Sequence, residues 1–167
     1  MKILWINPTV RYNDEARFEP YGILQLMAII DRDWHWRQTL YDANAHRVDN
    51  AVTNNFKGLE QVLNEDDYDV VCIGGLVTAY RYIRNALKVI RSHSAYKDTR
   101  IIVGGGCFSS MPSDIMRLIP DIDIGVIGEA YETVPELIHT LDKNEEIIGV
   151  KGIAYRKNEC LTALKDC

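Results

Sequence analysis

Three consecutive glycines, Gly104, Gly105 and Gly106, follow an apolar run and precede Cys107 and Ser109. Glycine has no Cβ atom, so a loop built from it lets another chemical group approach the backbone closely. The pattern predicts a buried strand that ends in a binding loop. Glycine also serves simply to turn the chain between a strand and a helix, so the triplet alone leaves both a ligand and a plain turn open.

These glycines do not form a dinucleotide-binding fingerprint. Counting G-x-G-x-x-G from Gly104 places Ser109 where the third glycine belongs. The triplet also comes late in the chain rather than after the first strand, where that fingerprint is found. A nicotinamide or flavin dinucleotide site is therefore disfavoured.

The cysteines and histidines lack metal-ligand spacing. Cys72, Cys107, Cys160 and Cys167 form neither a C-x-x-C pair nor a three-cysteine cluster. We therefore expect no metal site and no iron–sulfur cluster in this chain. Cys72 lies in an apolar run and is expected to be buried, whereas Cys107 follows the glycines and could be accessible.

Strand and helix patterns alternate along the chain. Apolar runs predict strands at residues 2–6, 37–41, 69–75, 101–103 and 122–127. Apolar residues at helical spacing follow each strand. They are Ile23, Leu26, Met27 and Ile30; Phe56, Leu59, Val62 and Leu63; Ile83, Ala86, Leu87 and Ile90; Ile115, Leu118 and Ile119; and Val134, Leu137, Ile138 and Leu141.

Five strand–helix units predict an α/β fold with a doubly wound, five-stranded parallel sheet, Rossmann-like or flavodoxin-like, with helices on both faces. We favour the strand order 2-1-3-4-5. Residues 149–164 break the alternation and predict a C-terminal β-hairpin that turns at residues 157–159. We therefore divide the chain into a domain of residues 1–145 and a hairpin segment of residues 146–167.

In this fold the loops 7–20, 74–80, 104–110 and 128–132 gather at the carboxyl ends of the strands. Open parallel sheets bind ligands at that edge, near the point where the strand order reverses. Three of these loops contain glycine and the fourth is long. Their convergence predicts a binding site more strongly than any single loop does.

The composition excludes several classes of partner. A net charge of −5 over 167 residues provides no basic surface for nucleic acid. No apolar run approaches the roughly 20 residues that span a bilayer, and the N-terminus has no signal-peptide pattern. We expect a cytoplasmic protein without a nucleic-acid or membrane partner.

Several segments together resemble the N-terminal cobalamin (B12)-binding domain of B12-dependent radical SAM enzymes. They are Asn7-Pro8, Pro20-Tyr21-Gly22, the run from Gly74 through Gly75 and Leu76 to Thr78, the run from Val103 to Gly106, and the run from Asp121 to Gly128 and Glu129. The resemblance covers nearly the whole chain. Its most specific element is the part from Asp123 to Glu129.

The resemblance implies that cobalamin lies across the strand ends. The residues that it assigns to cobalamin are Pro8, Gly74, Gly75, Leu76, Thr78, Gly104, Gly105, Gly106, Cys107, Ser109, Gly128 and Glu129. Residues 152–156 are similar to the connector that leads to a radical SAM domain. The Cys-x-x-x-Cys-x-x-Cys motif is absent, so the 4Fe-4S cluster and S-adenosylmethionine would belong to a domain outside this chain. The implied activity is methyl transfer, or radical cyclisation or rearrangement, with no catalytic residue in this chain.

The sequence departs from related cobalamin domains in two ways. The loop after the first strand lacks the Asp-x-His-x-x-Gly motif, whose histidine is the lower ligand of cobalt in other cobalamin domains. Asp33-Trp34-His35 mimics its start, but Gln38 stands in place of the glycine. Gly74 occupies the position of a serine, which removes a hydroxyl. The resemblance thus implies cobalamin held without a protein histidine, or no cobalamin.

Two alternatives remain open. One is a docking or interaction module with the same fold that no longer binds cobalamin. The other is a receiver or flavodoxin-like flavin domain. A receiver requires an acidic pair after the first strand and a phosphorylatable aspartate after the third, where Asn7 and Gly74 stand instead. A flavodoxin requires a phosphate-binding loop rich in hydroxyl groups after the first strand, and Thr9 alone matches this requirement poorly.

Overall fold

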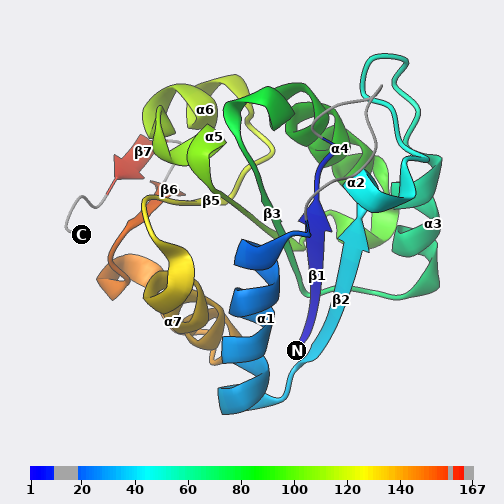
Figure 1. The fold of residues 1–167 in the computed structure, drawn as a ribbon. Coiled ribbons are helices and arrows are strands. Elements are labelled where there is room, and N and C mark those ends of the chain that lie inside the picture. The colour runs from blue at the N-terminus through cyan, green and yellow to red at the C-terminus, as the bar shows by residue number, and fades with distance from the viewer. Residues whose placement is uncertain (10–18, 158–159, 164–167) are drawn as a thin grey trace.

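The computed structural model describes residues 1–9, 19–157 and 160–163. A twisted sheet runs through the centre of the molecule, with helices on both of its faces (Figure 1). Its strands are β1 (Lys2–Asn7), β2 (Arg37–Asp42), β3 (Val70–Gly74), β4 (Arg100–Gly104), β5 (Ile124–Val126), β6 (Ile153–Lys157) and β7 (Cys160–Ala163).

The sheet order is β2-β1-β3-β4-β5-β6-β7. The first five strands are parallel and lie in the predicted order 2-1-3-4-5. The sheet has seven strands rather than the predicted five, because β6 pairs antiparallel with β5, and β7 pairs antiparallel with β6. The predicted hairpin therefore extends the sheet, which becomes a seven-stranded, mostly parallel one.

Two layers of helices cover the sheet (Figure 1). Helices α1 (Tyr21–Trp34) and α7 (Ala130–Asp142) pack on one face, and α3 (Lys57–Glu65), α4 (Tyr80–Ser92), α5 (Gly106–Ser109) and α6 (Pro112–Leu118) on the other. The shorter elements are α2 (Ala43–His46) and the 3₁₀ turns η1 (Val77–Ala79), η2 (Ser94–Tyr96) and η3 (Ile147–Gly149). No helix in the described part of the chain is long and apolar enough to cross a membrane.

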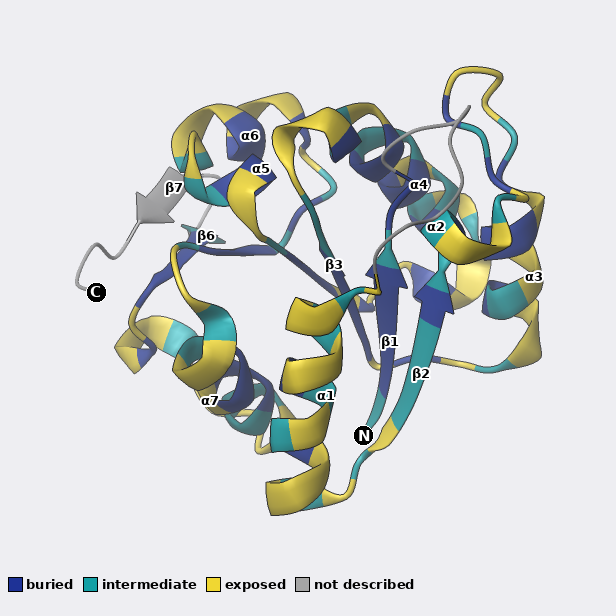
Figure 2. Cartoon of the chain, viewed as in Figure 1, coloured by how far each residue is buried: buried dark blue, intermediate teal, exposed yellow. Residues whose placement is uncertain are grey.

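Alternation along each strand divides the core into two clusters. Ile3 and Trp5 of β1 face α1 and α7, whereas Leu4 and Ile6 face α3 and α4. Successive side chains of a strand point to opposite faces of the sheet, so a parallel strand covered on both faces must be apolar throughout. Figure 2 shows the resulting buried strands beneath helices whose outer faces are exposed.

Two details differ from the sequence prediction. Ile115, Leu118 and Ile119 were predicted together on one helix, but Leu118, the last residue of α6, is exposed, while Ile115 and Ile119 are buried. The loop after β4 contains the short helix α5, which buries Phe108. The Phe108 ring lies over Gly125 of β5, where a Cβ atom would come within 1.7 Å of it.

Candidate functional site

A cavity of about 740 Å³ opens at the carboxyl ends of β1, β3, β4 and β5. It lies on the face of the sheet that α1 and α7 cover, and residues from the first turns of both helices line it. This is the edge at which open parallel sheets bind ligands, and the volume is in the range of small-molecule sites.

Two glycines on neighbouring strands open this cavity. Gly74 and Gly104 are paired in register at the ends of β3 and β4. Two residues earlier, and therefore on the same face, the paired side chains of Cys72 and Ile102 form a continuous row with Trp5 of β1. The row of side chains thus stops where the glycines begin, and the missing side chains leave a hollow above it.

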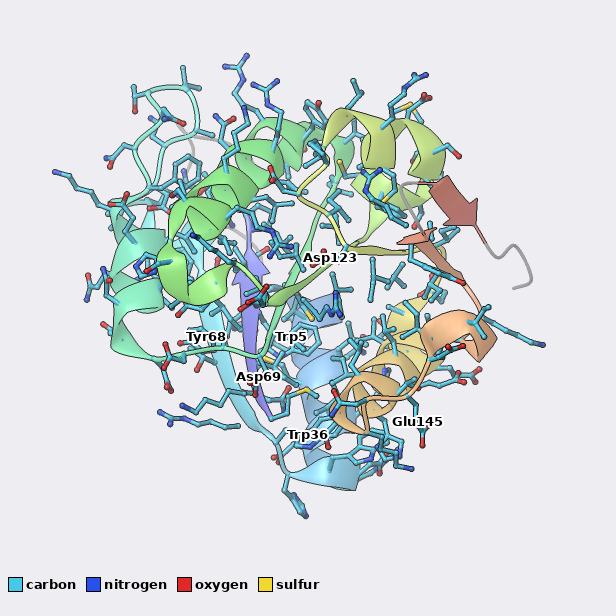
Figure 3. The ribbon with its side chains drawn as sticks, turned by 180° about the vertical axis from the view of Figure 1, so that it is seen from behind. Trp5, Trp36, Tyr68, Asp69, Asp123 and Glu145 are labelled. Carbon is cyan, nitrogen blue, oxygen red and sulfur yellow. The ribbon has the colours of Figure 1, made fainter. Side chains whose placement is uncertain are left out.

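The floor of the cavity is apolar. The buried lining residues whose side chains lie on this face of the sheet are Trp5, Leu26, Cys72, Ile102, Val126 and Val134. Burial raises the pKa of the Cys72 thiol well above its ordinary value, so this side chain stays a neutral thiol. The indole nitrogen of Trp5, which lies in the middle of the sheet (Figure 3), donates to Oε1 of Gln38 at 3.0 Å.

The loops after β3 and β4 form one side of the mouth and are packed backbone to backbone. The backbone N–H of Cys107 donates to the carbonyl oxygen of Gly75 at 2.8 Å. Gly105 has φ +78° and ψ −174°, a conformation that is essentially reserved for glycine. A Cβ atom on Gly75 would lie 3.0 Å from Pro8 and Ala79. Gly75 and Gly105 are therefore required by the packing of the loops themselves.

Gly104 and Gly106 are different, because a Cβ atom would fit at both. At Gly104 the nearest atom would be Cβ of Val126 at 3.6 Å, and at Gly106 it would be Cδ2 of Leu76 at 3.7 Å. These are ordinary van der Waals distances. Both residues line the cavity, so a side chain at either position would occupy space that the fold leaves free.

The loop after β5 completes the mouth on the side of α7. Ser109 Oγ accepts a hydrogen bond from the backbone nitrogen of Gly128 at 3.0 Å, which ties this loop to α5. Glu129 is exposed at the start of α7, where a carboxylate also stabilises the positive end of the helix. The two helices that border the cavity are also joined, because the hydroxyl of Tyr131 in α7 donates to Oε1 of Gln25 in α1.

Most of the residues that the sequence assigned to cobalamin surround this cavity. Those that line it are Gly74, Gly75, Leu76, Gly104, Gly105, Gly106, Ser109, Gly128 and Glu129. Pro8 is buried behind Gly75, and Thr78 is exposed in η1 without lining the cavity. Cys107, which could have been accessible, is buried among the residues of the opposite face, and burial raises the pKa of its thiol.

Sequence reasoning missed the floor. The strand patterns include Trp5, Cys72 and Ile102 but do not predict that these side chains share a face and a register. The signal was present, because each lies two residues before the end of its strand: Asn7, Gly74 and Gly104. Residues 10–18 of the long first loop, also predicted at this edge, lie outside the described residues.

No histidine lines the cavity among the described residues, which include all four histidines of the chain. His35 ends α1, His46 stacks on Tyr41, and His139 lies against Trp34 and Trp36. The fourth, His93, follows α4 and contacts Asn64. Within the described parts of the chain, no group of three or more His, Cys, Asp or Glu residues could hold a metal ion.

Asp123 lies away from the cavity although it begins the most specific sequence element. It stands just before β5 and bonds to the start of β4, at the amino ends of these strands, whereas the cavity lies at their carboxyl ends. Its Oδ2 accepts from Nη2 of Arg91 at 2.6 Å and from the backbone nitrogen of Ile101 at 2.7 Å. Asp123 therefore braces α4, β4 and β5 against one another.

Known proteins share this fold over nearly the whole chain. The radical S-adenosylmethionine methyltransferase TsrM from Kitasatospora setae, with tryptophan substrate and a SAM analog bound, matches with a TM-score of 0.76 and 17% identity over 98% of this chain and 30% of its own. The cobalamin-dependent S-adenosylmethionine radical enzyme OxsB, with aqua-cobalamin and S-adenosylmethionine bound, matches with a TM-score of 0.78 and 17% identity over 99% of this chain and 22% of its own.

A sequence relative is the uncharacterized methyltransferase PH0819 from Pyrococcus horikoshii. It is 27% identical over 103 residues, which are 62% of this chain and 22% of the relative. The chain thus corresponds to less than a third of these longer proteins. The model of the B12 binding domain family matches residues 10–138, which include β2 to β5 and most of α7. The chain therefore belongs to the B12-binding domain family.

Proposed function

We propose that this chain is the N-terminal cobalamin-binding domain of a radical SAM enzyme, and that it holds the corrin without a histidine below the cobalt. One observation carries the proposal. A cavity with an apolar floor and a glycine-lined mouth lies at the ligand-binding edge of the sheet, and every histidine of the chain lies elsewhere.

The residues present fit cobalamin. The free space at Gly104 and Gly106 is what a ligand close to the backbone requires, because the fold itself would accept a Cβ atom at both positions. We assign the nucleotide tail of cobalamin to the cavity and the corrin to its mouth, against Leu76. Leu76 is 63% exposed, so the bound corrin would cover apolar surface that now faces water.

Polar groups at the mouth would orient the cofactor. Ser109 is held by the N–H of Gly128, and its hydroxyl hydrogen remains available to donate. Glu129 lies beside it at the start of α7 and can accept hydrogen bonds. The corrin carries amide side chains around its rim, which both donate and accept hydrogen bonds. Pro8 and Cys107 support the loops rather than the ligand in this assignment, and Thr78 has no role in it.

The bound cobalamin would supply methyl transfer or radical chemistry, and this chain would bind and orient it. S-adenosylmethionine and the 4Fe-4S cluster would be held by another domain. TsrM and OxsB are long enough to contain such a domain, because this chain covers only 30% and 22% of them. We assign residues 146–167 to the connection with that domain. Methyl transfer is the activity that the names of PH0819 and TsrM support, and cyclisation or rearrangement is the other class.

The absence of a lower histidine has a direct test. The 167-residue chain is loaded with cobalamin, which is then reduced to the cobalt(II) state, and its electron paramagnetic resonance spectrum is recorded. We expect no hyperfine coupling from an axial nitrogen, and the same spectrum from variants that replace each histidine by alanine. Nitrogen coupling that disappears in one of these variants would contradict the proposal.

The docking-module alternative is less well supported by the site. A domain that had lost its ligand would be free to fill the hollow above Cys72 and Ile102 with a larger side chain at Gly104, where a Cβ atom makes only ordinary contacts, since interiors pack without voids. Instead the cavity is kept open. A folded chain that retains no corrin would favour the docking module.

A further inference from the structure

We propose that the floor of the cavity discriminates between the bases at the end of the nucleotide tail, accepting an apolar benzimidazole and rejecting adenine. The inference rests on the proposed function, because it assigns the tail to this cavity. Corrinoids with different bases share the corrin ring, so any preference between them must come from the part of the site that meets the base.

The floor offers no free hydrogen-bonding side chain among the described residues. Leu26, Ile102, Val126 and Val134 are aliphatic, and Cys72 contributes a neutral thiol, which is a weak donor. The polar lining residues lie at the strand ends and in the loops, as Asn7, Ser109 and Glu129 do, or in the first turns of α1 and α7, as Tyr21 and Tyr131 do. A base that reaches the floor therefore meets carbon and sulfur.

Trp5 is the one floor residue with a strong donor, and that donor is already used. Its Nε1 donates to Oε1 of Gln38 at 3.0 Å, while Nε2 of the same amide donates to the carbonyl oxygen of Met27 at 2.9 Å. Gln38 on β2 thus links β1 to α1, and its side chain occupies the indole N–H as a hydrogen-bond acceptor. The indole ring contributes apolar area to the cavity and no hydrogen bond.

The two bases differ in the hydrogen bonds to water that they lose when they are buried in this apolar floor. Dimethylbenzimidazole carries two methyl groups, and these gain from burial. Adenine carries an amino group and additional ring nitrogens, each hydrogen-bonded to water before binding. Buried polar groups without partners are costly, whereas apolar groups of the same shape are not. The site should therefore hold cobalamin more tightly than its adenine analogue.

The experiment measures the dissociation constants of three corrinoids for the 167-residue chain by equilibrium dialysis. They are cobalamin, the adenine-containing cobamide, and cobinamide, which has no nucleotide tail. We expect cobalamin to bind about tenfold more tightly than the adenine form, which corresponds to about 1.4 kcal/mol. Equal binding of cobalamin and the adenine form would overturn the inference, while binding of none of the three would instead contradict the proposed function.

Two buried cysteines provide a matched pair of variants. Cys72 lines the cavity, and Cys107 is buried in the cluster on the other face of the sheet. Cys72→Ser places a hydroxyl in the floor and should reduce the preference for cobalamin several-fold, whereas Cys107→Ser should leave it unchanged. If Cys72→Ser does not fold by circular dichroism, Val126→Thr makes an equivalent change from β5. An undiminished preference in the folded floor variant would overturn the inference.

Discussion

A Cβ atom on Gly105 would lie 2.9 Å from the backbone nitrogen of Gly75, a distance that side chains do not tolerate from main-chain atoms. These residues belong to the loops after β4 and β3, and the N–H of Cys107 joins the same two loops. The glycines at the mouth thus divide into two kinds. Gly75 and Gly105 hold the loops together, whereas Gly104 and Gly106 leave space.

Gly105→Ala should destabilise the chain whether or not a ligand is present. The substitution places a side chain in a conformation nearly restricted to glycine, which costs about 1–3 kcal/mol, and the contact with Gly75 adds to this. Urea unfolding measures the loss. Gly149→Ala is the control, because a Cβ atom there meets nothing within 4 Å. Equal stability of the two variants would contradict this role of Gly105.

Gly104→Val should leave the fold intact and weaken cobalamin binding by about tenfold or more. The first added atom makes ordinary contacts, and the remaining atoms extend into the cavity, where they would displace the nucleotide tail. Equilibrium dialysis gives the affinity and urea unfolding the stability. Gly149→Val should bind cobalamin like the unmodified chain. Unchanged affinity in Gly104→Val would show that the tail does not use this cavity.

Asp123→Asn should lower the free energy of unfolding by about 1–2 kcal/mol without changing the affinity for cobalamin. It weakens charge-assisted hydrogen bonds to Arg91 and to the backbone of β4, at the edge opposite the cavity. The control is Asp121→Asn, which removes the same charge nearby but keeps the backbone oxygen through which Asp121 accepts a hydrogen bond from Arg91. A loss of cobalamin binding in stable, folded Asp123→Asn would contradict a purely structural role.

Asp66 should make the stability depend on pH in acid. A hydrogen bond from Lys2 Nζ at 2.6 Å, with the nearby charge of Arg37, holds the pKa of the Asp66 carboxyl below its ordinary value. A depressed pKa in the folded state adds stability above the ordinary value of about 3.9 and loses it as the pH falls through the folded-state value.

Asp66→Asn should therefore be less stable than the unmodified chain at pH 7, and the difference should shrink toward zero in acid. Urea unfolding at a series of pH values, with both proteins measured side by side, gives this difference. A difference that stays constant down to pH values well below 3.9 would show that the ion pairs of Asp66 contribute nothing.

The strand pattern of the sequence predicted the fold well because parallel strands buried on both faces are continuous apolar runs. The run 69–75 and the run 101–103 correspond to β3 and β4. The hairpin was also foreseen, but its pairing with β5 was not, since local pattern does not say which edge a strand joins. Leu118 lies in α6 as predicted, but as the last residue of that helix it is exposed, whereas Ile115 and Ile119 are buried.

The mouth of the site was predictable and its floor was not. The mouth consists of loops rich in glycine, and glycines after a strand can be recognised in the sequence one residue at a time. The floor depends on which side chains of β1, β3 and β4 share a face and a register, as Trp5, Cys72 and Ile102 do. Cys107 showed the opposite error, because its position after the glycines suggested exposure while the start of α5 turns it into the core.

We propose that this chain binds cobalamin at the carboxyl ends of its strands without a histidine ligand. The most direct measurement is a spectral titration of the purified chain with hydroxocobalamin, followed by desalting. We predict that the corrin stays with the protein and shows the spectrum of cobalamin whose nitrogenous lower ligand has left the cobalt. A chain that is folded by circular dichroism yet emerges from desalting free of corrin would show that it does not bind cobalamin by itself.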